Sequence, residues 1–421
     1  MGGSSIIGLS SYLKCLSYVD GHASMNPVEE KVNNPMAWKK KAYNVEKLRQ
    51  LAKKELPQPI FDFADGAAED ERTRSRNESA FDNYWLVPKP MNGAAVRDLS
   101  IDLFGHRHSM PLMIGPTGLS GLFWPDGERA TARAAAAAGI GFCLSHGSVC
   151  TLEALAETKT HPRWMQIFLY RDRAFTEELV HRAEAAQYDG IVLTVDNQIL
   201  GKRERDLANG FTIPPEFSVS QYAAMFGKFS WWWRMRNELR QITFGNYVRP
   251  GKKEDIKRLA ARMAELLDPG LTWKDVEWIR GMTSLPLIIK GILSPDEAED
   301  AIRFGANAVI VSNHGGRQLD GAISSLEALP KIVRQVGGRV PVLLDGGVRR
   351  GTDVVIALAL GVTGCLLGRP QLWGVSVAGE AGVRHLLDIY YKEIDTAMGL
   401  CGASRISDIT EELLANRSSN L

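Results

Sequence analysis

A histidine and an arginine stand three residues apart in the segment SNHGGRQ, residues 312–318. An imidazole can take up a proton near neutral pH, and a guanidinium can hold an anion through two parallel hydrogen bonds. His314 and Arg317 could therefore remove a proton from a molecule whose anionic group the arginine binds. A capped turn with an arginine in an ion pair explains the same spacing when the pair stands alone, so the surrounding elements must decide.

Short apolar runs recur along the chain, and one of them ends just before this pair. Residues 308–311 (AVIV) predict a buried strand of a parallel sheet. Seven further runs of this kind lie at residues 112–114, 141–144, 164–168, 191–195, 287–290, 342–345 and 365–368. Ala-rich amphipathic segments, such as 128–138 and 176–186, separate most of them. This alternation predicts parallel βαβ units, and their number favours a closed (β/α)8 TIM barrel over an open sheet.

We expect one large barrel domain with additions. With 421 residues, 45% of them hydrophobic, the chain can bury a large core, and α/β barrels often reach this length as one domain. We expect a loose N-terminal extension over residues 1–35, the barrel over 36–413 with an insertion over 210–270, and a C-terminal tail over 414–421. A helical segment that begins at Asn44 is expected to cover one end of the barrel.

Charge and cysteine content argue against two kinds of site. The formal net charge is +1, which argues against nucleic-acid binding through bulk charge. The five cysteines show no metal-ligand spacing, so no metal site is expected. Their odd number and scatter indicate reduced thiols in a cytoplasmic protein. Residues 6–19 are interrupted by Lys14 and are too short and too polar to span a bilayer.

Polar residues gather where the predicted strands end, which is the active face of such a barrel. They are Pro116, Thr117, Gly118, Ser145, Gln166, Thr194, Asp196 and Lys290. The last two strands lead into glycine- and arginine-rich loops, at residues 345–353 (DGGVRRGTD) and at Gly368-Arg369. Glycine lets backbone N–H groups approach an anion and arginine adds positive charge, so these loops predict a phosphate site. Tight turns with surface arginines would explain each loop alone. They would not explain why both loops follow the last two predicted strands.

Taken together, these segments resemble the FMN-dependent 2-hydroxyacid dehydrogenases and oxidases, a family that includes glycolate oxidase, flavin lactate dehydrogenases and (S)-mandelate dehydrogenase. The resemblance covers roughly residues 44–413. The matching segments are 193–196, 287–291, 312–318 and 345–353, with 114–119 and 124–125 most similar to (S)-mandelate dehydrogenase. The resemblance implies bound FMN and the oxidation of an (S)-2-hydroxyacid to the 2-oxoacid.

The family's catalytic roles carry over to matching positions. By this resemblance His314 is the base that takes a substrate proton during two-electron transfer to the flavin, and Asp196 orients its imidazole. Arg317 holds the substrate carboxylate with help from Arg203, and Lys290 stabilises negative charge on the reduced flavin. A buried structural ion pair is the alternative interpretation of Lys290 and Asp196.

The resemblance also implies the cofactor-binding residues. The flavin ring would contact Thr117, Gly118, Ser145, Gln166, Thr194 and Ser312, with Pro116 in the same loop. Asp345 would bind the ribityl chain, followed by Gly346. The phosphate would be held by Gly347, Arg349, Gly368 and Arg369.

Two positions depart from the family pattern. Phe63 and Phe168 stand where the family usually has tyrosines, so two hydroxyl groups are missing from the expected pocket. Aromatic or bulky substrates are therefore favoured, and His146 is either a replacement donor or a structural residue. Two alternatives remain: FMN-dependent oxidation of a non-carboxylate substrate, such as an amine or a larger natural product, or a flavin-binding protein without turnover.

The electron acceptor and the surroundings of the enzyme are also suggested by sequence. By the family resemblance, Gly118 favours a dehydrogenase that passes electrons to a quinone over an oxidase that uses O2, and a glycine required only by the turn is the alternative. Residues 220–262 mix aromatic and basic side chains, including Trp231, Trp232 and Trp233, which favours peripheral attachment to the inner face of a membrane. A subunit interface or a lid over the site would suit the same composition. The family resemblance implies a homotetramer.

Overall fold

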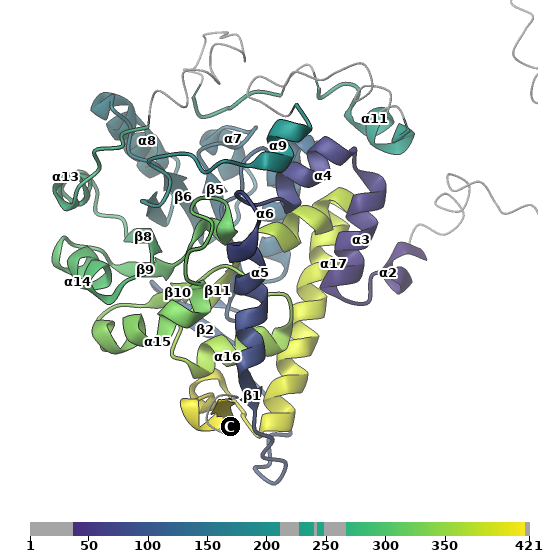
Figure 1. The fold of residues 1–421 in the computed structure, drawn as a ribbon, viewed down its shortest axis with the longest axis vertical. Helices are drawn as coiled ribbons and strands as arrows, with labels where there is room; N and C mark the ends of the chain where they lie inside the picture. Colours follow the sequence, from purple (N-terminus) through teal and green to yellow (C-terminus); the bar gives the residue numbers. More distant parts are fainter. Residues whose placement is uncertain (1–36, 211–226, 240–241, 248–266, 417–421) are drawn as a thin grey trace, which may run out of the picture. The chain divides into compact units, whose positions relative to one another are not determined.

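The residues that the computed structural model describes are 37–210, 227–239, 242–247 and 267–416. The chain divides into two compact units, residues 1–42 and 43–421. The described part of the first unit contains one short helix, α2 (Ala37–Lys41). The extension expected over residues 1–35 lies outside the described residues, and every further element belongs to the second unit (Figure 1).

Eight parallel strands form a closed barrel in the second unit. In chain order they are β4 (Leu112–Ile114), β5 (Gly141–Ser145), β6 (Arg163–Ile167), β7 (Gly190–Thr194), β8 (Leu287–Ile292), β9 (Ala308–Val311), β10 (Val342–Leu344) and β11 (Gly364–Leu367). They follow the same order around the barrel, and β11 pairs with β4 to close it. Each predicted apolar run is one of these strands, so the predicted (β/α)8 barrel is confirmed.

Helices precede the barrel and connect its strands (Figure 1). Those that precede it are α3 (Val45–Glu55), α4 (Gln58–Asp65) and α5 (Arg72–Ser79). Those that follow its strands are α6 (Gly127–Ala137), α7 (Leu152–Ala156), α8 (Arg173–Ala185), α13 (Trp273–Met282), α14 (Pro295–Arg303), α15 (Ser325–Val336), α16 (Gly351–Ala359) and α17 (Arg369–Cys401). Local sequence explains their ends: in α15, Ser324 and Glu327 form a capping box, and Gly337 (φ 59°) ends the helix. The predicted amphipathic segments correspond to α6 and α8.

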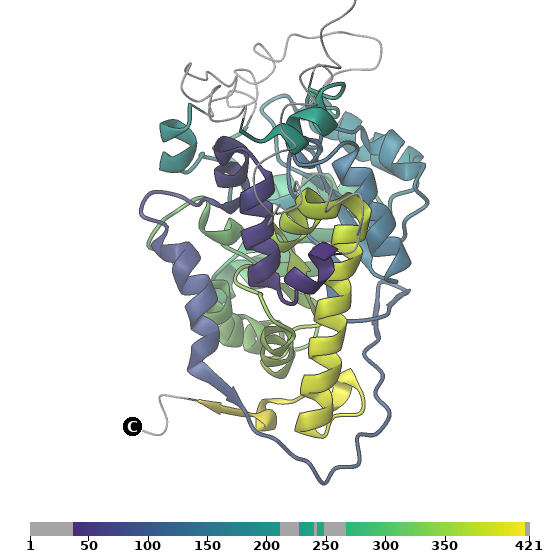
Figure 2. The same ribbon diagram turned by 90° about the vertical axis from the view of Figure 1, so that its right-hand side faces the viewer.

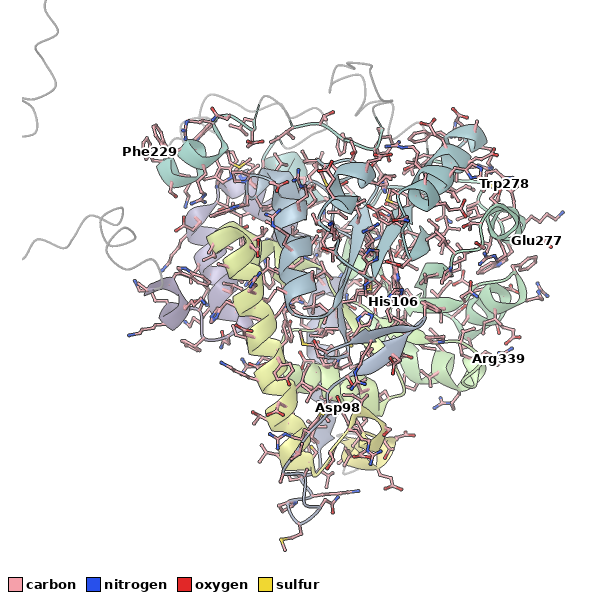
Figure 3. All side chains as sticks on the ribbon, turned by 180° about the vertical axis from the view of Figure 1, so that it is seen from behind. Asp98, His106, Phe229, Glu277, Trp278 and Arg339 are labelled. Atoms are coloured by element: carbon pink, nitrogen blue, oxygen red, sulfur yellow. The ribbon has the colours of Figure 1, made fainter. Side chains whose placement is uncertain are left out.

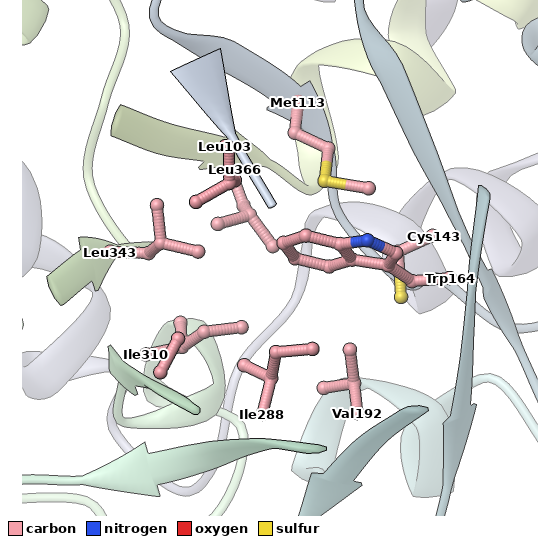
Figure 4. Close-up of a cluster of buried hydrophobic side chains, with 10 residues drawn as sticks. Leu103, Met113, Cys143, Trp164, Val192, Ile288, Ile310, Leu343 and Leu366 are labelled. Atoms are coloured by element: carbon pink, nitrogen blue, oxygen red, sulfur yellow. The ribbon is translucent and has the colours of Figure 1, made fainter. Parts of the chain in front are cut away.

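Apolar side chains fill the barrel interior (Figure 4). The strands contribute Met113, Cys143, Trp164, Val192, Ile288, Ala308, Ile310, Leu343 and Leu366, each at most 3% exposed. Trp164 is the bulkiest of them, and an added Cβ at Gly190 would lie 3.0 Å from its indole ring. Leu103, from the hairpin of β2 (Ile101–Leu103) and β3 (His106–His108), joins this cluster. The interior is therefore a packed core, and any ligand site must lie at an end of the barrel.

The helices before the barrel are held in place by a capping residue and a buried ion pair. Asn44 caps α3, as the sequence predicts, and α3 lies alongside α17 (Figure 2). Arg49 of α3 binds the buried carboxylate of Asp65 through hydrogen bonds of 2.6 and 2.8 Å. This ion pair fixes the end of α4, from which Phe63 reaches the cavity described below.

A small antiparallel sheet pairs a strand that precedes the barrel with the last described strand of the chain. It pairs β1 (Tyr84–Leu86), which follows the 3-10 helix η1 (Ala80–Asn83), with β12 (Leu414–Asn416). Residues 414–416, expected in the C-terminal tail, therefore belong to the folded unit.

The described parts of the insertion between β7 and β8 include α9 (Glu204–Ala208) and α11 (Phe229–Met235). Trp231 is only 1% exposed and donates its indole N–H to the carbonyl of Leu122 at 3.0 Å. Trp233 is 59% exposed and Phe229 67%, and Figure 3 shows Phe229 pointing away from the ribbon. The prediction that Trp231 belongs to an exposed aromatic surface is therefore wrong.

The rest of that expected surface, residues 220–226, 240–241 and 248–262, lies outside the described residues. None of the helices in the described part of the chain combines the length and the apolar character that a membrane crossing requires.

We expect Trp231→Ala to lower the free energy of unfolding by about 3–5 kcal/mol, because it leaves a cavity and removes the partner of the Leu122 carbonyl. Trp233→Ala is the matched control in the same helix and should change it by less than about 0.5 kcal/mol, because that side chain is exposed. Urea unfolding followed by circular dichroism measures both. Equal effects of the two substitutions would contradict the burial of Trp231.

Candidate active site

A cavity of about 540 Å³ opens at the carboxyl ends of the barrel strands. Of the residues expected to act on substrate, it is lined by His314, Lys290, Arg317, Arg203, Phe63, Phe168 and His146. Of those expected to hold the cofactor, it is lined by Pro116, Thr117, Gly118, Ser145, Gln166, Thr194, Asp345, Gly346, Gly347, Arg349, Gly368 and Arg369. Asp196 and Ser312 lie behind this wall and bind residues within it. The structure thus brings the predicted residues together, while their individual roles stay predictions.

His314 and Asp196 form a hydrogen-bonded pair beside the cavity. His314 has a left-handed backbone (φ 58°) in the turn after β9, and its Nδ1 lies 2.8 Å from Asp196 Oδ1. A proton on Nδ1 makes this contact a hydrogen bond and leaves Nε2 as the acceptor. Burial lowers the pKa of His314, Asp196 opposes this shift, and the charge of Lys290 adds to it. The imidazole is therefore neutral at pH 7 and can accept a proton.

The close approach of Asp196 depends on an irregularity in β8. The pairing of β8 with β9 shifts register between Lys290 and Ile292, and Gly291 between them has φ 112°. An added Cβ on Gly291 would lie 2.7 Å from the Cβ of Asp196. Glycine at this position therefore makes room for the carboxylate that orients the imidazole.

Lys290 brings a buried positive charge to the end of β8. Its ammonium donates to Ser312 Oγ at 2.8 Å and pairs with Asp345 Oδ2 at 3.0 Å. Burial alone would lower the pKa of Lys290, but Asp345 and then Asp196 outweigh burial and raise it above the ordinary 10.5. The buried hydroxyl of Ser312 also accepts from the His314 backbone N–H at 3.1 Å. Lys290 is thus paired with Asp345, while Asp196 faces the histidine.

Arginines add further positive charge to the cavity. Arg317 donates through one guanidinium nitrogen to the carbonyls of Phe63 and Gly66, at 2.8 and 2.9 Å. Burial, and then the neighbouring charges of Arg203 and Arg369, hold the pKa of Arg317 well below its usual range. Burial also lowers the pKa of Arg203, and burial with two further arginines lowers that of Arg369 to about 9. Buried guanidiniums with other guanidiniums as neighbours suit a site for an anion.

Several buried polar atoms of this site have no hydrogen-bond partner among the described residues. They are Thr194 Oγ1, Asp345 Oδ1, Arg203 Nε and Arg369 Nε. Because buried polar groups in native proteins are hydrogen-bonded, these atoms indicate a ligand with donors and acceptors of its own.

The glycine loops give a ligand access to the backbone. Gly346 and Gly347 have φ values of 92° and 89°, and an added Cβ at Gly347 would lie 1.9 Å from the Asn77 carbonyl oxygen, so the turn itself requires these glycines. At Gly368 nothing lies within 4 Å of an added Cβ. Open backbone at Gly368, beside Arg369, suits a phosphate, and the unpaired oxygens suit the hydroxyl and N–H groups of a flavin nucleotide. The residues present therefore fit FMN.

A second polar group surrounds Gln166 at the end of β6. Its side-chain oxygen accepts from the Ser145 hydroxyl at 3.2 Å and lies 3.1 Å from His146 Nδ1. Burial lowers the pKa of His146 to about 4, so its ring is neutral and Nδ1 donates to Gln166. The His146 ring meets Phe168 edge-on, with ring centroids 4.3 Å apart. His146 is thus fixed in the wall, beside one of the two phenylalanines that depart from the family pattern.

The cavity also includes residues that the sequence motifs did not single out, namely Asn197, Leu200, Leu207, Phe244, Tyr247 and Leu267. All of them belong to the connection between β7 and β8. One sequence signal is Gly245, where an added Cβ would lie 2.6 Å from the Val149 carbonyl oxygen. A single glycine in a long connection indicates a close approach, but it does not identify the partner.

Comparison with known proteins extends these observations. A family model described as FMN-dependent dehydrogenase matches residues 52–416. An L-lactate oxidase from Nostoc sp. is 42% identical over 375 residues, which cover 88% of this chain and 97% of that protein. An L-lactate dehydrogenase from Alcaligenes faecalis is 42% identical over 367 residues, covering 87% and 97%.

Solved structures agree with these relatives. The structure of the monotopic membrane protein (S)-mandelate dehydrogenase matches with a TM-score of 0.85 at 37% identity, covering 89% of this chain and 99% of that one. Because the match in sequence and in fold extends over the whole barrel, the chain belongs to the FMN-dependent 2-hydroxyacid dehydrogenases and oxidases.

Proposed function

We propose that this enzyme oxidises a bulky or aromatic (S)-2-hydroxyacid to the 2-oxoacid and passes the electrons through FMN to a separate acceptor. The observation that carries the proposal is the 2.8 Å contact of His314 with Asp196, which places a base in the same cavity as the guanidiniums of Arg317 and Arg203. A base and an anion clamp in one cavity are what the removal of a proton from a carboxylate-bearing substrate requires.

Each charged residue then has a defined task. Arg317 and Arg203 bind the substrate carboxylate, which relieves their mutual repulsion. His314 Nε2 takes the substrate proton, and Asp196 accepts the Nδ1–H bond and stabilises the imidazolium that forms. Bound FMN supplies the two-electron oxidant. Lys290 stays protonated and stabilises negative charge that develops beside it.

The remaining polar residues hold the cofactor. We assign the flavin ring to Pro116, Thr117, Gly118, Ser145, Gln166 and Thr194, with Ser312 acting through Lys290. Asp345 takes the ribityl chain with its unpaired Oδ1. The phosphate is assigned to Gly346, Gly347, Arg349, Gly368 and Arg369.

The apolar character of the wall supports a bulky substrate. Phe63 and Phe168 lack the hydroxyl group of a tyrosine, and further apolar side chains line the same cavity, among them Leu200, Leu207, Phe244 and Leu267. A wall of this kind gains more from burying an aromatic or branched side chain than from burying the methyl group of lactate.

For the acceptor, we propose a quinone, with O2 as the alternative. An added Cβ at Gly118 would lie 3.2 Å from the Gly147 carbonyl oxygen. An alanine at this position would therefore require a small shift of the loop. The L-lactate oxidase and the L-lactate dehydrogenase have the same sequence identity to this chain, 42%, so identity does not distinguish the two acceptors.

We also propose a cytoplasmic homotetramer that attaches peripherally to the inner face of a membrane. Phe229 and Trp233 stack on the exposed side of α11, with ring centroids 6.1 Å apart, and Arg236 lies 4.1 Å from the Trp233 ring centroid. Exposed aromatic rings beside a cation suit an anionic membrane surface. The (S)-mandelate dehydrogenase of similar fold is a monotopic membrane protein.

We expect His314→Ala to retain FMN but to lose flavin reduction by about 10²–10⁴-fold, the usual contribution of a general base. Anaerobic mixing with glycolate, lactate and mandelate, followed by the bleaching of the flavin, measures the rate. His181→Ala, at an exposed histidine of α8, is the control and should reduce at the rate of the unaltered enzyme. Full activity of His314→Ala would remove the proposed base, and no reduction of the unaltered enzyme by any acid would contradict the function.

The acid limb of kcat/KM should lie below pH 6.5. Because the pKa of His314 is lowered from its ordinary 6.5, the imidazole stays neutral until the pH falls below that value, and activity is lost as it becomes protonated. Asp196→Asn removes a charge that raises this pKa, so the limb should move to still lower pH while the rate falls. Rates measured across pH in both enzymes test this. A limb above pH 6.5, or one that rises in Asp196→Asn, would exclude the assignment.

Replacing both Phe229 and Trp233 by serine should reduce sedimentation of the protein with anionic lipid vesicles, because it removes the exposed rings of α11. Met91→Ser is the control, since Met91 is 94% exposed and lies outside the insertion. Vesicle binding that is equal in all three proteins would argue against attachment through α11.

A further inference from the structure

One short segment of the β7–β8 insertion forms part of the cavity wall. It is the sequence FGNY, residues 244–247, and both Phe244 and Tyr247 line the cavity. The catalytic assignments above use neither residue. Tyr247 is nevertheless a phenol in a pocket whose two expected phenols are phenylalanines.

The segment is fixed to the loop that follows β5. Asn246 is 1% exposed, accepts from the Leu152 backbone N–H at 2.8 Å and donates to Ser148 Oγ at 2.9 Å. The Gly245 N–H donates to the Ser148 carbonyl at 3.0 Å. An added Cβ at Gly245 would lie 2.6 Å from the Val149 carbonyl oxygen, so the two backbones touch. Tyr247 therefore has a defined position in the cavity wall.

The hydroxyl of Tyr247 has a hydrogen to donate. It lies 2.8 Å from the hydroxyl of Tyr170, which is fully buried and has no other hydroxyl partner among the described residues. If Tyr247 donated to Tyr170, the hydrogen of Tyr170 would be left buried without an acceptor, which is unfavourable. The favoured arrangement has Tyr170 donating to Tyr247. The hydrogen of Tyr247 is then left without an acceptor among the described residues, and Tyr247 lines the cavity.

The surroundings of Tyr247 are mainly ring carbon. Its ring meets His146 at a centroid distance of 5.3 Å, and His146 in turn meets Phe168. The Nδ1 donor of His146 is already used by Gln166. Tyr247 therefore adds a hydrogen-bond donor to an otherwise largely apolar wall.

The order of the strands around the barrel indicates which end of the substrate lies near the Tyr247 hydroxyl. Three strands separate β5 from β9 in either direction around the closed barrel, so the two are opposite. His314 and Arg317 follow β9, whereas Tyr247 is attached to the loop after β5. A substrate whose carboxylate is held by Arg317 extends its side chain across the barrel mouth toward Tyr247.

We propose that Tyr247 is a specificity residue that donates a hydrogen bond to an acceptor atom on the substrate side chain. The preferred substrates are then bulky 2-hydroxyacids with an oxygen or nitrogen acceptor at the end remote from the carboxylate. This inference rests on the proposed function and narrows its substrate class.

The test compares (S)-mandelate with (S)-4-methoxymandelate, whose ether oxygen can accept but cannot donate. The FMN-loaded enzyme should have the higher kcat/KM for the methoxy acid, and Tyr247→Phe should reduce that preference about tenfold, the effect of one hydrogen bond. Tyr170→Phe is the matched control: it breaks the same hydroxyl pair but keeps the phenol of Tyr247, so the preference should remain. Calorimetric dissociation constants of the two 2-oxoacid products should follow the same pattern.

Three results would overturn the inference. The unaltered enzyme could reduce its flavin with both acids at equal kcat/KM, Tyr247→Phe could keep the preference, or Tyr170→Phe could lose it equally, which would make the pair purely structural. These outcomes leave the proposed function intact. Failure of both acids to bleach the flavin of the unaltered enzyme would instead overturn the proposed function and this inference together.

Discussion

Positive charge gathered around one cavity at the end of the barrel is the constraint on which the site depends. Lys290 is compensated by Asp345 and Asp196, and its pKa is raised. Arg317 and Arg369 have other arginines as neighbours, and their pKa values are lowered. Lys290 thus has carboxylate partners within the protein, whereas Arg317 and Arg369 have a charge environment that favours an anionic ligand. Binding of such ligands must therefore also stabilise the folded state.

Local patterns in the sequence were sufficient for the barrel and for most of the site. Each strand is a short apolar run, and residue types such as Val309 and Ile310 favour buried parallel strands. Parallel strands of one barrel bring their carboxyl ends to one rim, so polar residues just past the runs had to meet there. His314, Lys290 and Thr194 were found by this rule. Their individual roles came from the family resemblance, because spacing alone does not distinguish a base from a structural histidine.

The features that escaped prediction depend on contacts between distant segments. Trp231 and Trp233 have nearly the same local sequence, yet Trp231 is buried and bonded to the Leu122 carbonyl whereas Trp233 is exposed. Gly291 looks like any glycine near a strand end until Asp196 is seen against it. The segment 244–247 has no motif, since its position follows from hydrogen bonds to the loop after β5. Tertiary contacts of this kind leave little trace in a single sequence.

The insertion contributes to the pocket and to the outer surface at the same time. Trp231 fixes α11 against Leu122, while Asn246 fixes the segment 244–247 against the loop after β5. These two attachment points hold the described parts of the insertion against the barrel unit. With phenylalanines at 63 and 168, the proposed hydrogen bond from Tyr247 would come from the insertion and not from the barrel scaffold. Such a segment can change substrate preference without disturbing the strands that position His314 and Lys290.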